Sequence, residues 1–234
     1  ESPAPRLSSQ LRDRMTSAAV ELAKSVKYRS AGTAEYLVRG EECFFLEVNS
    51  RLQVEHTVTE LVTGTDLVAL QIELALADRQ QSAFSLPPAT SQRGHAIEVR
   101  ICAEDPARGF IPGPGRIEML RWPTGTGIRV ESGIEEGQEV RGLFDSMLAK
   151  LVVWAPTRQQ ALNRMRLALQ ETVVLGVATN IDYLAWLCTR PEVVEVNFNT
   201  KSLENFKYAP PQAAESAFLR PVASTTGPWF EVEL

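Results

Sequence analysis

Hydrophobic and polar residues alternate along one stretch of the chain, residues 44–56. The even-numbered positions from 44 to 54 are apolar, with Ser50 as the exception. The odd-numbered positions from 47 to 55 are all polar: Glu47, Asn49, Arg51, Gln53 and Glu55. Because successive side chains of a strand point to opposite faces of its sheet, we predict a strand here. One face would bury hydrocarbon, and the other would present carboxylates, amides and a guanidinium.

A partner strand is predicted just before this stretch, over residues 34–39, joined to it by a short loop that contains a glycine. If Arg39 pairs with Cys43, counting back along both strands places Glu35 opposite Glu47. The two strands then form a hairpin whose polar face carries two opposed carboxylates.

The carboxylates of Glu35 and Glu47 would repel each other, since like charges directly opposed on a sheet are destabilising. Protonation of one carboxylate or a bound divalent cation would relieve this repulsion. With the amide oxygen of Asn49 they form a set of hard oxygen ligands, which suits Mg²⁺ or Mn²⁺ with substrate phosphates completing the shell. The alternative interpretation is the solvated polar face of an amphipathic hairpin.

Periodicity and capping residues also predict the other elements. The predicted helices cover residues 9–26, 58–62, 66–77, 158–174 and 181–188. Gly64 and Gly176 are expected to end the second and fourth of them. The further predicted strands cover residues 95–103, 115–122, 127–131 and 147–154.

Residues 86–93, which include two consecutive prolines, are interpreted as a linker between two units. We therefore predict a first unit over residues 1–85 and a second over residues 94–208. An irregular tail with several prolines is expected over residues 209–234.

Composition excludes some classes of function. The chain has 234 residues and a formal net charge of −5, which argues against a nucleic-acid or acidic-membrane partner. No apolar run approaches the ~18 residues of a membrane span. The cysteines at 43, 102 and 188 are widely spaced and form no C-x-x-C pair. We therefore expect reduced thiols, no zinc site and a cytoplasmic protein, with a mitochondrial location as the alternative.

The segment from Glu47 to His56, EVNSRLQVEH, closely resembles the biotin carboxylase signature of biotin-dependent carboxylases, which are ATP-grasp enzymes. Three later blocks agree with this resemblance: residues 94–106, 110–115 and 144–151. The match extends from residue 1 to about residue 187. It implies an α+β fold, in which the C-terminal part of an ATP-grasp domain precedes the biotin carboxylase C-terminal domain.

The resemblance implies roles at the nucleotide. Glu35 and Glu47 would bind the Mg²⁺ (or Mn²⁺) that bridges the ATP phosphates, with Asn49 assisting, because the transferring phosphoryl group must be neutralised. Leu37 would contribute an apolar contact to adenine.

The resemblance also implies roles around bicarbonate and biotin. Arg51 would hold the bicarbonate and carboxyphosphate region, while Gln53 and the backbone of Val54 fix bicarbonate. Glu55 would be the base that removes the bicarbonate proton. Arg100 would stabilise the enolate-like oxygen of biotin.

Structural roles are the alternatives. Arg51 would then form a surface salt bridge to Glu47 or Glu55, Gln53 would be an ordinary polar strand residue, and Arg100 would face solvent. We expect His56 to hydrogen-bond the following helix, and His95 to be structural. Asp145 lies near the biotin side in the family, or simply organises a turn.

The family's glycine-rich lid and phosphate-binding lysines precede this region, and the chain contains no G-x-x-x-x-G-K-[ST] or G-x-G-x-x-G loop. We therefore expect a C-terminal piece of an enzyme that carboxylates biotin with bicarbonate and Mg-ATP, a piece that has little turnover alone. The implied partners are a biotinylated carrier domain and a carboxyltransferase, with a homodimer in the intact enzyme.

Three rival interpretations remain: a non-catalytic fragment in subunit or partner contacts, another ATP-grasp carboxylate ligase, and a folded remnant without activity. The final acceptor is not encoded in this segment. Residues 179–184 and 200–210 somewhat resemble urea carboxylases, and acyl-CoA carboxylase alpha subunits share the same motifs.

Overall fold

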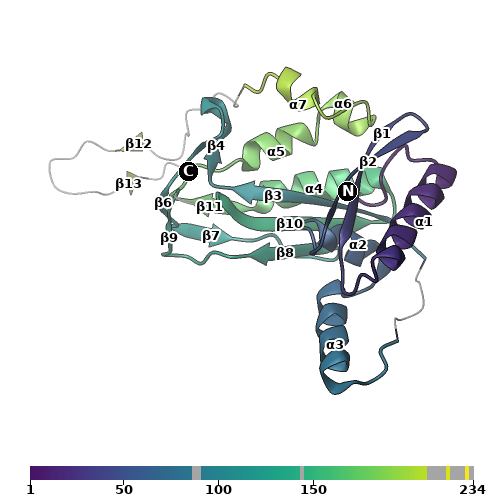
Figure 1. Cartoon of the computed structure of the whole chain (residues 1–234). Helices are drawn as coiled ribbons and strands as arrows, with labels where there is room; N and C mark the ends of the chain where they lie inside the picture. The colour runs from purple at the N-terminus through teal and green to yellow at the C-terminus, as the bar shows by residue number, and fades with distance from the viewer. Residues whose placement is uncertain (86–90, 143–144, 210–219, 222–229, 232–234) are drawn as a thin grey trace.

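The computed structural model describes residues 1–85, 91–142, 145–209, 220–221 and 230–231. At its centre lies an antiparallel sheet in the order β3 (His95–Cys102), β10 (Met147–Ala155), β8 (Ile128–Ser132) (Figure 1). Helix α4 (Arg158–Glu171) packs on one face of this sheet, and α2 (His56–Thr63) packs on β3 and β10 through a separate apolar cluster. The sheet therefore contacts α2, from the N-terminal part of the chain, as well as α4, from the C-terminal part.

Strand β10 is buried along most of its length because helices cover the sheet around it. Its apolar run extends from Leu148 to Ala155 with Lys150 as the only charged residue. A strand buried on both faces has such a run rather than an alternating pattern.

We expect Leu151→Ala to lower the free energy of unfolding by about 2–5 kcal/mol, because Leu151 is fully buried and its loss leaves a cavity. Urea denaturation of the chain measures this change. The matched control is Leu167→Ala on α4, where the side chain is 54% exposed, and a change within about 0.5 kcal/mol is expected. Equal effects of the two substitutions would contradict the assignment of the core.

Helix α1 (Ser9–Ser25) begins where expected, and the Ser8 side chain accepts a hydrogen bond from the backbone N–H of Leu11. It lies beside the hairpin of β1 (Thr33–Arg39) and β2 (Glu42–Asn49) (Figure 1). Of the apolar stripe on α1, only Leu11 is fully buried. Several large apolar side chains of the hairpin are exposed, among them Leu37, Phe44, Phe45, Leu46 and Val48.

The hairpin register confirms one predicted pair and corrects another. Arg39 pairs with Glu42 rather than with Cys43, yet Glu35 does lie opposite Glu47. The loop is tighter than predicted because Gly40 adopts a positive φ of 59°. An irregularity between Glu35 and Tyr36 then shifts the register back by one residue.

The predicted strand over residues 44–56 is too long, because β2 ends at Asn49. Asn49 pairs with Thr33, the first residue of β1, so the chain beyond it has no partner strand. Residues 50–55 form bends and a turn that lead into α2. The strict alternation there does not place Arg51, Gln53 and Glu55 on one strand face.

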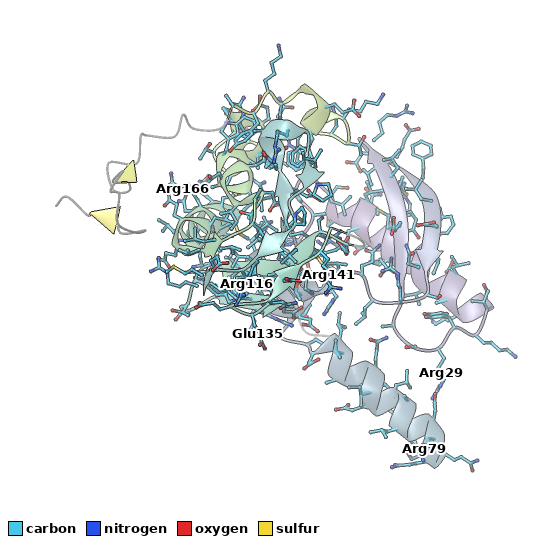
Figure 2. All side chains as sticks on the ribbon, turned by 90° about the vertical axis from the view of Figure 1, so that its left-hand side faces the viewer. Arg29, Arg79, Arg116, Glu135, Arg141 and Arg166 are labelled. Atoms are coloured by element: carbon cyan, nitrogen blue, oxygen red, sulfur yellow. The ribbon has the colours of Figure 1, made fainter. Side chains whose placement is uncertain are left out.

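The next two helices agree with the predictions. Gly64 ends α2 in the left-handed conformation, and Asp66 caps α3 (Leu67–Gln80) through the N–H of Ala69. Helix α3 projects from the rest of the molecule (Figure 1). Figure 2 shows Arg29 beside this helix, where the Arg29 guanidinium forms an ion pair with Asp78.

The C-terminal half differs from the prediction in the division of one strand and in the end of one helix, besides several short elements that were not predicted. The predicted strand over 115–122 is divided into β6 (Gly115–Arg116) and β7 (Met119–Arg121). Helix α4 ends at Glu171 rather than continuing to 174, so Gly176 does not stop it. The residues predicted to end this helix instead form strand β11 (Val173–Leu175), because the β-branched residues there pair with β7.

Short elements complete the chain. They are β4 (Glu104–Asp105), the 3₁₀ turn η1 (Pro106–Arg108), β5 (Ile111–Pro112), β9 (Glu139–Val140), α5 (Ile181–Leu187), α6 (Pro191–Val194), α7 (Ser202–Asn205), β12 (Arg220–Pro221) and β13 (Phe230–Glu231). Most of the predicted linker, 86–90, and most of the predicted tail lie outside the described residues. Among the described helices, none is long and apolar enough to cross a membrane.

Candidate functional site

Two carboxylates and two amides meet at the end of the β1–β2 hairpin. The Asn49 side-chain nitrogen donates to Glu35 Oε1 at 2.7 Å and to Glu47 Oε1 at 3.2 Å. The Gln53 side-chain nitrogen also donates to Glu35 Oε1. The structure thus brings together four of the predicted site residues, and their amide N–H groups relieve the carboxylate repulsion in a way that the sequence did not suggest.

This cluster fits a divalent cation only with ligands from elsewhere. Within the described ranges, no group of three or more His, Cys, Asp and Glu side chains could hold a metal ion. Glu35 and Glu47 supply carboxylate oxygens from facing strands, and Asn49 would have to rotate its amide to present oxygen. A cation held by these carboxylates would complete its shell with water or phosphate oxygens.

A second pair of charged groups lies where the irregular segment meets the central sheet. Arg100, near the end of β3, donates from Nη2 to Glu55 Oε2 at 2.8 Å. The two side chains are about half exposed, at 51% and 49%. Glu55 is the N-cap residue of α2, but its side chain makes no capping hydrogen bond. Its carboxylate therefore remains accessible to a small substrate.

Arg51 matches neither predicted surface salt bridge. Its Nη1 donates to the backbone oxygen of Leu52 at 3.0 Å, and Glu55 pairs with Arg100 instead. Arg51 takes part in none of the ion pairs between described residues. The exposed guanidinium follows the carboxylate cluster along the chain and is open to an anion.

Sequence reasoning did not single out Lys150. The residue is 9% exposed, and its Nζ donates to the backbone oxygen of Val54 at 3.0 Å. It also forms an ion pair with Glu131 of β8. Burial by itself would raise the pKa of Glu131, but hydrogen bonds from Lys150 and Arg129 outweigh it and lower this pKa. The available signal was a single lysine within the apolar run of β10.

Asn180 lies within residues 179–184, which the sequence distinguished only by their resemblance to urea carboxylases. Its buried side chain accepts from the N–H of Cys102 at 2.9 Å and donates to the oxygen of Arg100 at 3.0 Å. These bonds occupy backbone groups of β3 on either side of Ile101. Asn180 thus holds the end of the strand that carries the Arg100 side chain.

Helix α2 is fixed to the sheet by polar contacts as well as by its apolar cluster. Thr57 donates its hydroxyl to Glu98 Oε2. Burial raises the pKa of Glu98, and this hydrogen bond opposes the rise. Glu60, which is buried, accepts from Arg129 Nη1 at 2.7 Å and from the N–H of Leu67 at 2.7 Å.

The structure also places the four other residues that were considered from the sequence, His56, His95, Asp145 and Leu37. His56 Nδ1 contacts the oxygen of Gln53 at 2.8 Å, so its bond is to the preceding turn and not to the following helix. His95 is buried beside Glu1. Asp145 accepts from the N–H of Met147 at 2.9 Å, as the turn interpretation predicts. Leu37 is 45% exposed on the hairpin.

Two families match successive parts of the chain. Residues 1–82 match the carbamoyl-phosphate synthase L chain ATP-binding domain. Residues 98–205 match the biotin carboxylase C-terminal domain. The unmatched residues between them include the predicted linker.

Relatives and solved structures agree with these matches. A pyruvate carboxylase subunit from Methanothermobacter thermautotrophicus is 46% identical over 183 residues, which cover 78% of this chain and 37% of that protein. The biotin carboxylase domain dimer of Hydrogenobacter thermophilus 2-oxoglutarate carboxylase, in complex with MgADP, ADP and bicarbonate, has a TM-score of 0.83 and 38% identity, covering 89% of this chain and 46% of that one. Kluyveromyces lactis urea carboxylase has a TM-score of 0.83 and 37% identity, covering 88% and 18%.

The chain therefore spans less than half the length of each of these proteins. The two matched domains, their order along the chain and the shared fold nevertheless agree with one another. The chain carries a biotin carboxylase C-terminal domain, preceded by part of an ATP-binding domain, and is similar over this length to biotin carboxylases and biotin-dependent carboxylase subunits.

Proposed function

We propose that this chain is part of a biotin carboxylase, a ligase that carboxylates biotin with bicarbonate and Mg-ATP. Bicarbonate attacks the γ-phosphate to give carboxyphosphate and ADP. Carboxyphosphate releases CO₂, the phosphate takes a proton from the ureido nitrogen, and the biotin enolate captures CO₂. The observation that carries the proposal is the placement of Glu55 against Arg100, 2.8 Å apart, beside the hairpin that bears Glu35 and Glu47.

In this proposal each group acts on the substrate that its chemistry suits. Glu55 accepts the bicarbonate proton, since a carboxylate with half-exposed oxygens is within reach of a bound anion. Arg51, Gln53 and the backbone of Val54 orient bicarbonate. Arg100 stabilises the negative charge that develops on the biotin oxygen.

Glu35 and Glu47, with Asn49, would hold the Mg²⁺ or Mn²⁺, which neutralises phosphate charge when bound. The carboxylates already converge on the Asn49 amide, which would have to rotate to present its oxygen to the metal. Leu37 offers its exposed apolar side chain to adenine.

Substitution of a hairpin carboxylate tests the metal assignment. We expect Glu47→Gln to weaken Mn²⁺ binding to the chain in the presence of ADP by at least about tenfold, because it removes a charged oxygen ligand. Electron paramagnetic resonance of free Mn²⁺ measures this affinity. Glu73→Gln, on the exposed surface of α3, is the matched control. Equal affinities of the native chain and of both variants would contradict the assignment.

The isolated chain is expected to have no bicarbonate-dependent ATP hydrolysis, because its sequence contains no glycine-rich phosphate loop. Its buried lysine, Lys150, is already bonded to Val54 and Glu131. The assay measures ADP release by the purified chain with Mg²⁺, bicarbonate and biotin.

A fusion supplies the positive arm of this experiment. The chain is joined to the portion of the Hydrogenobacter thermophilus domain that it does not cover, and bicarbonate-dependent ADP release that biotin accelerates is expected. A folded fusion that binds ATP without turnover would contradict the catalytic proposal. It would favour the alternative, a non-catalytic fragment in subunit or partner contacts, which sedimentation analysis would show as an assembly.

The proposed partners are a biotinylated carrier domain and a carboxyltransferase, because carboxybiotin must be delivered to an acceptor. A homodimer is proposed for the intact enzyme. The similar proteins are named for pyruvate, 2-oxoglutarate and urea. They therefore do not select an acceptor, and the resemblance to urea or acyl-CoA carboxylases stays a prediction.

A further inference from the structure

We propose that Lys150 is a positioning residue that fixes the segment of residues 51–55 against the central sheet. The inference rests on the proposed function for its consequence, since this segment carries the groups assigned to bicarbonate. The geometry of Lys150 itself is independent of that assignment.

The contacts of Lys150 are unusual for a lysine. Its side chain is only 11% exposed, although it lies on the central strand among apolar neighbours. Burying an ammonium group is costly unless it is paired and hydrogen-bonded. Here the amine is paired with Glu131 and donates to the backbone oxygen of Val54. Its burial thus depends on a contact with the segment.

The register of the sheet explains why this contact matters. Lys150 lies directly between Arg100 on β3 and Glu131 on β8. Lys150 donates to the backbone of Val54, and Arg100 donates to the side chain of the next residue, Glu55. Two adjacent residues of the sheet therefore hold two consecutive residues of the segment.

The other restraints on the segment are the bond from the Gln53 side chain to Glu35 and the turn bonds to the backbone oxygens of Gln53 and Glu55. Residues 50–55 have no strand partner and form bends and a turn. The Arg100–Glu55 pair is half exposed, and such pairs contribute little to stability in water. The hydrogen bond from Lys150 is less exposed to water than the Arg100–Glu55 ion pair. We therefore infer that it contributes more than this ion pair to keeping the Glu55 carboxylate beside Arg100.

On the β8 side of Lys150, Arg129 connects the Lys150–Glu131 ion pair to α2. Arg129 contacts both Glu131 and the buried Glu60 of α2. Glu131 is therefore held between two cations, and it in turn orients the Lys150 amine. These contacts connect Glu60 in the second half of α2, through β8 and β10, to the segment before α2.

Hydrogen–deuterium exchange of the 234-residue chain tests the proposal. We expect Lys150→Met to accelerate amide exchange over residues 51–56 by about tenfold or more, because local opening no longer breaks this bond. Exchange over α4 should change little. Lys150→Gln, which keeps a polar but shorter side chain, should behave as Lys150→Met, whereas Lys150→Arg should restore part of the protection.

The matched control is Val153→Ala, which removes buried volume from the same strand, in the cluster shared with α4, without touching the segment or α2. It should accelerate exchange over the whole sheet and α4 alike. The proposal is overturned if Lys150→Met and Lys150→Gln leave residues 51–56 within about twofold of the native rate. It is also overturned if they reproduce the uniform pattern of Val153→Ala.

Bicarbonate separates this proposal from the proposed function. In the native chain, added bicarbonate should slow exchange over residues 51–56, and Lys150→Met should abolish that slowing. If bicarbonate has no effect on the native chain while Lys150→Met still accelerates exchange, the bicarbonate assignment of the segment fails and the positioning role of Lys150 stands.

Discussion

Replacing Glu55 by Gln is expected to lower bicarbonate-dependent ADP release by the fusion enzyme by roughly a hundredfold to ten-thousandfold, the range that a general base contributes. Glutamine has nearly the same shape as glutamate but cannot accept the bicarbonate proton. The measurement is initial ADP release at saturating ATP, with the rate in bicarbonate-free buffer subtracted.

Glu55→Gln should leave the fold intact, which makes the loss interpretable. The Glu55 side chain makes no capping bond to α2, and its half-exposed pair with Arg100 is worth only about 0–1 kcal/mol. Glu42→Gln is the matched control, because Glu42 also forms an exposed ion pair with an arginine, Arg39, away from the site. A fall of less than about fivefold for Glu55→Gln would exclude a proton-accepting role.

Replacing Arg100 by Met is the second substitution with a large expected effect. Biotin carboxylation by the fusion enzyme should fall by roughly a hundredfold to a thousandfold, as for the loss of a donor that stabilises developing negative charge. Arg100→Lys should retain part of the activity, because it keeps the charge but loses the planar paired donors. The measurement is transfer of labelled bicarbonate to free biotin.

The relative effects on carboxybiotin formation and on ATP hydrolysis distinguish the role of Arg100 from that of Glu55. Loss of Arg100 should reduce carboxybiotin formation more than it reduces biotin-independent ATP hydrolysis, whereas loss of Glu55 should reduce both. Arg166→Met is the matched control, since Arg166 is exposed on α4 (Figure 2). An equal fall of both reactions in Arg100→Met would contradict a role specific to biotin.

For Arg100, the sequence predicts the strand on which it lies, and the tertiary structure determines its partner. Alternation along residues 95–102 predicts correctly that Arg100 lies on a strand. It does not indicate that the opposing group is Glu55, which is 45 residues earlier in the chain. That contact depends on α2 packing on β3 and β10, an arrangement that no local pattern encodes.

In the β1–β2 hairpin, by contrast, reasoning from the local sequence was sufficient to predict a contact between two site residues. The Glu35–Glu47 pair was predicted correctly by counting from Arg39–Cys43, although that starting pair is wrong. A tighter loop and a compensating register shift cancel each other. The end of β2 at Asn49 was missed because a strand continues only as long as it has a partner, whatever the alternation of its residues.

Local sequence was sufficient to predict the longer helices and strands, the helix boundaries at Ser9, Gly64 and Asp66, and the signature that carries the carboxylates. These features follow from periodicity and capping, which act over a few residues. The burial of Lys150, its bond to Val54 and the bonds from Asn180 to the end of β3 emerge only from the folded arrangement. A lysine is buried only where distant groups neutralise and bond its amine, and those groups come together only when the sheet and α2 pack.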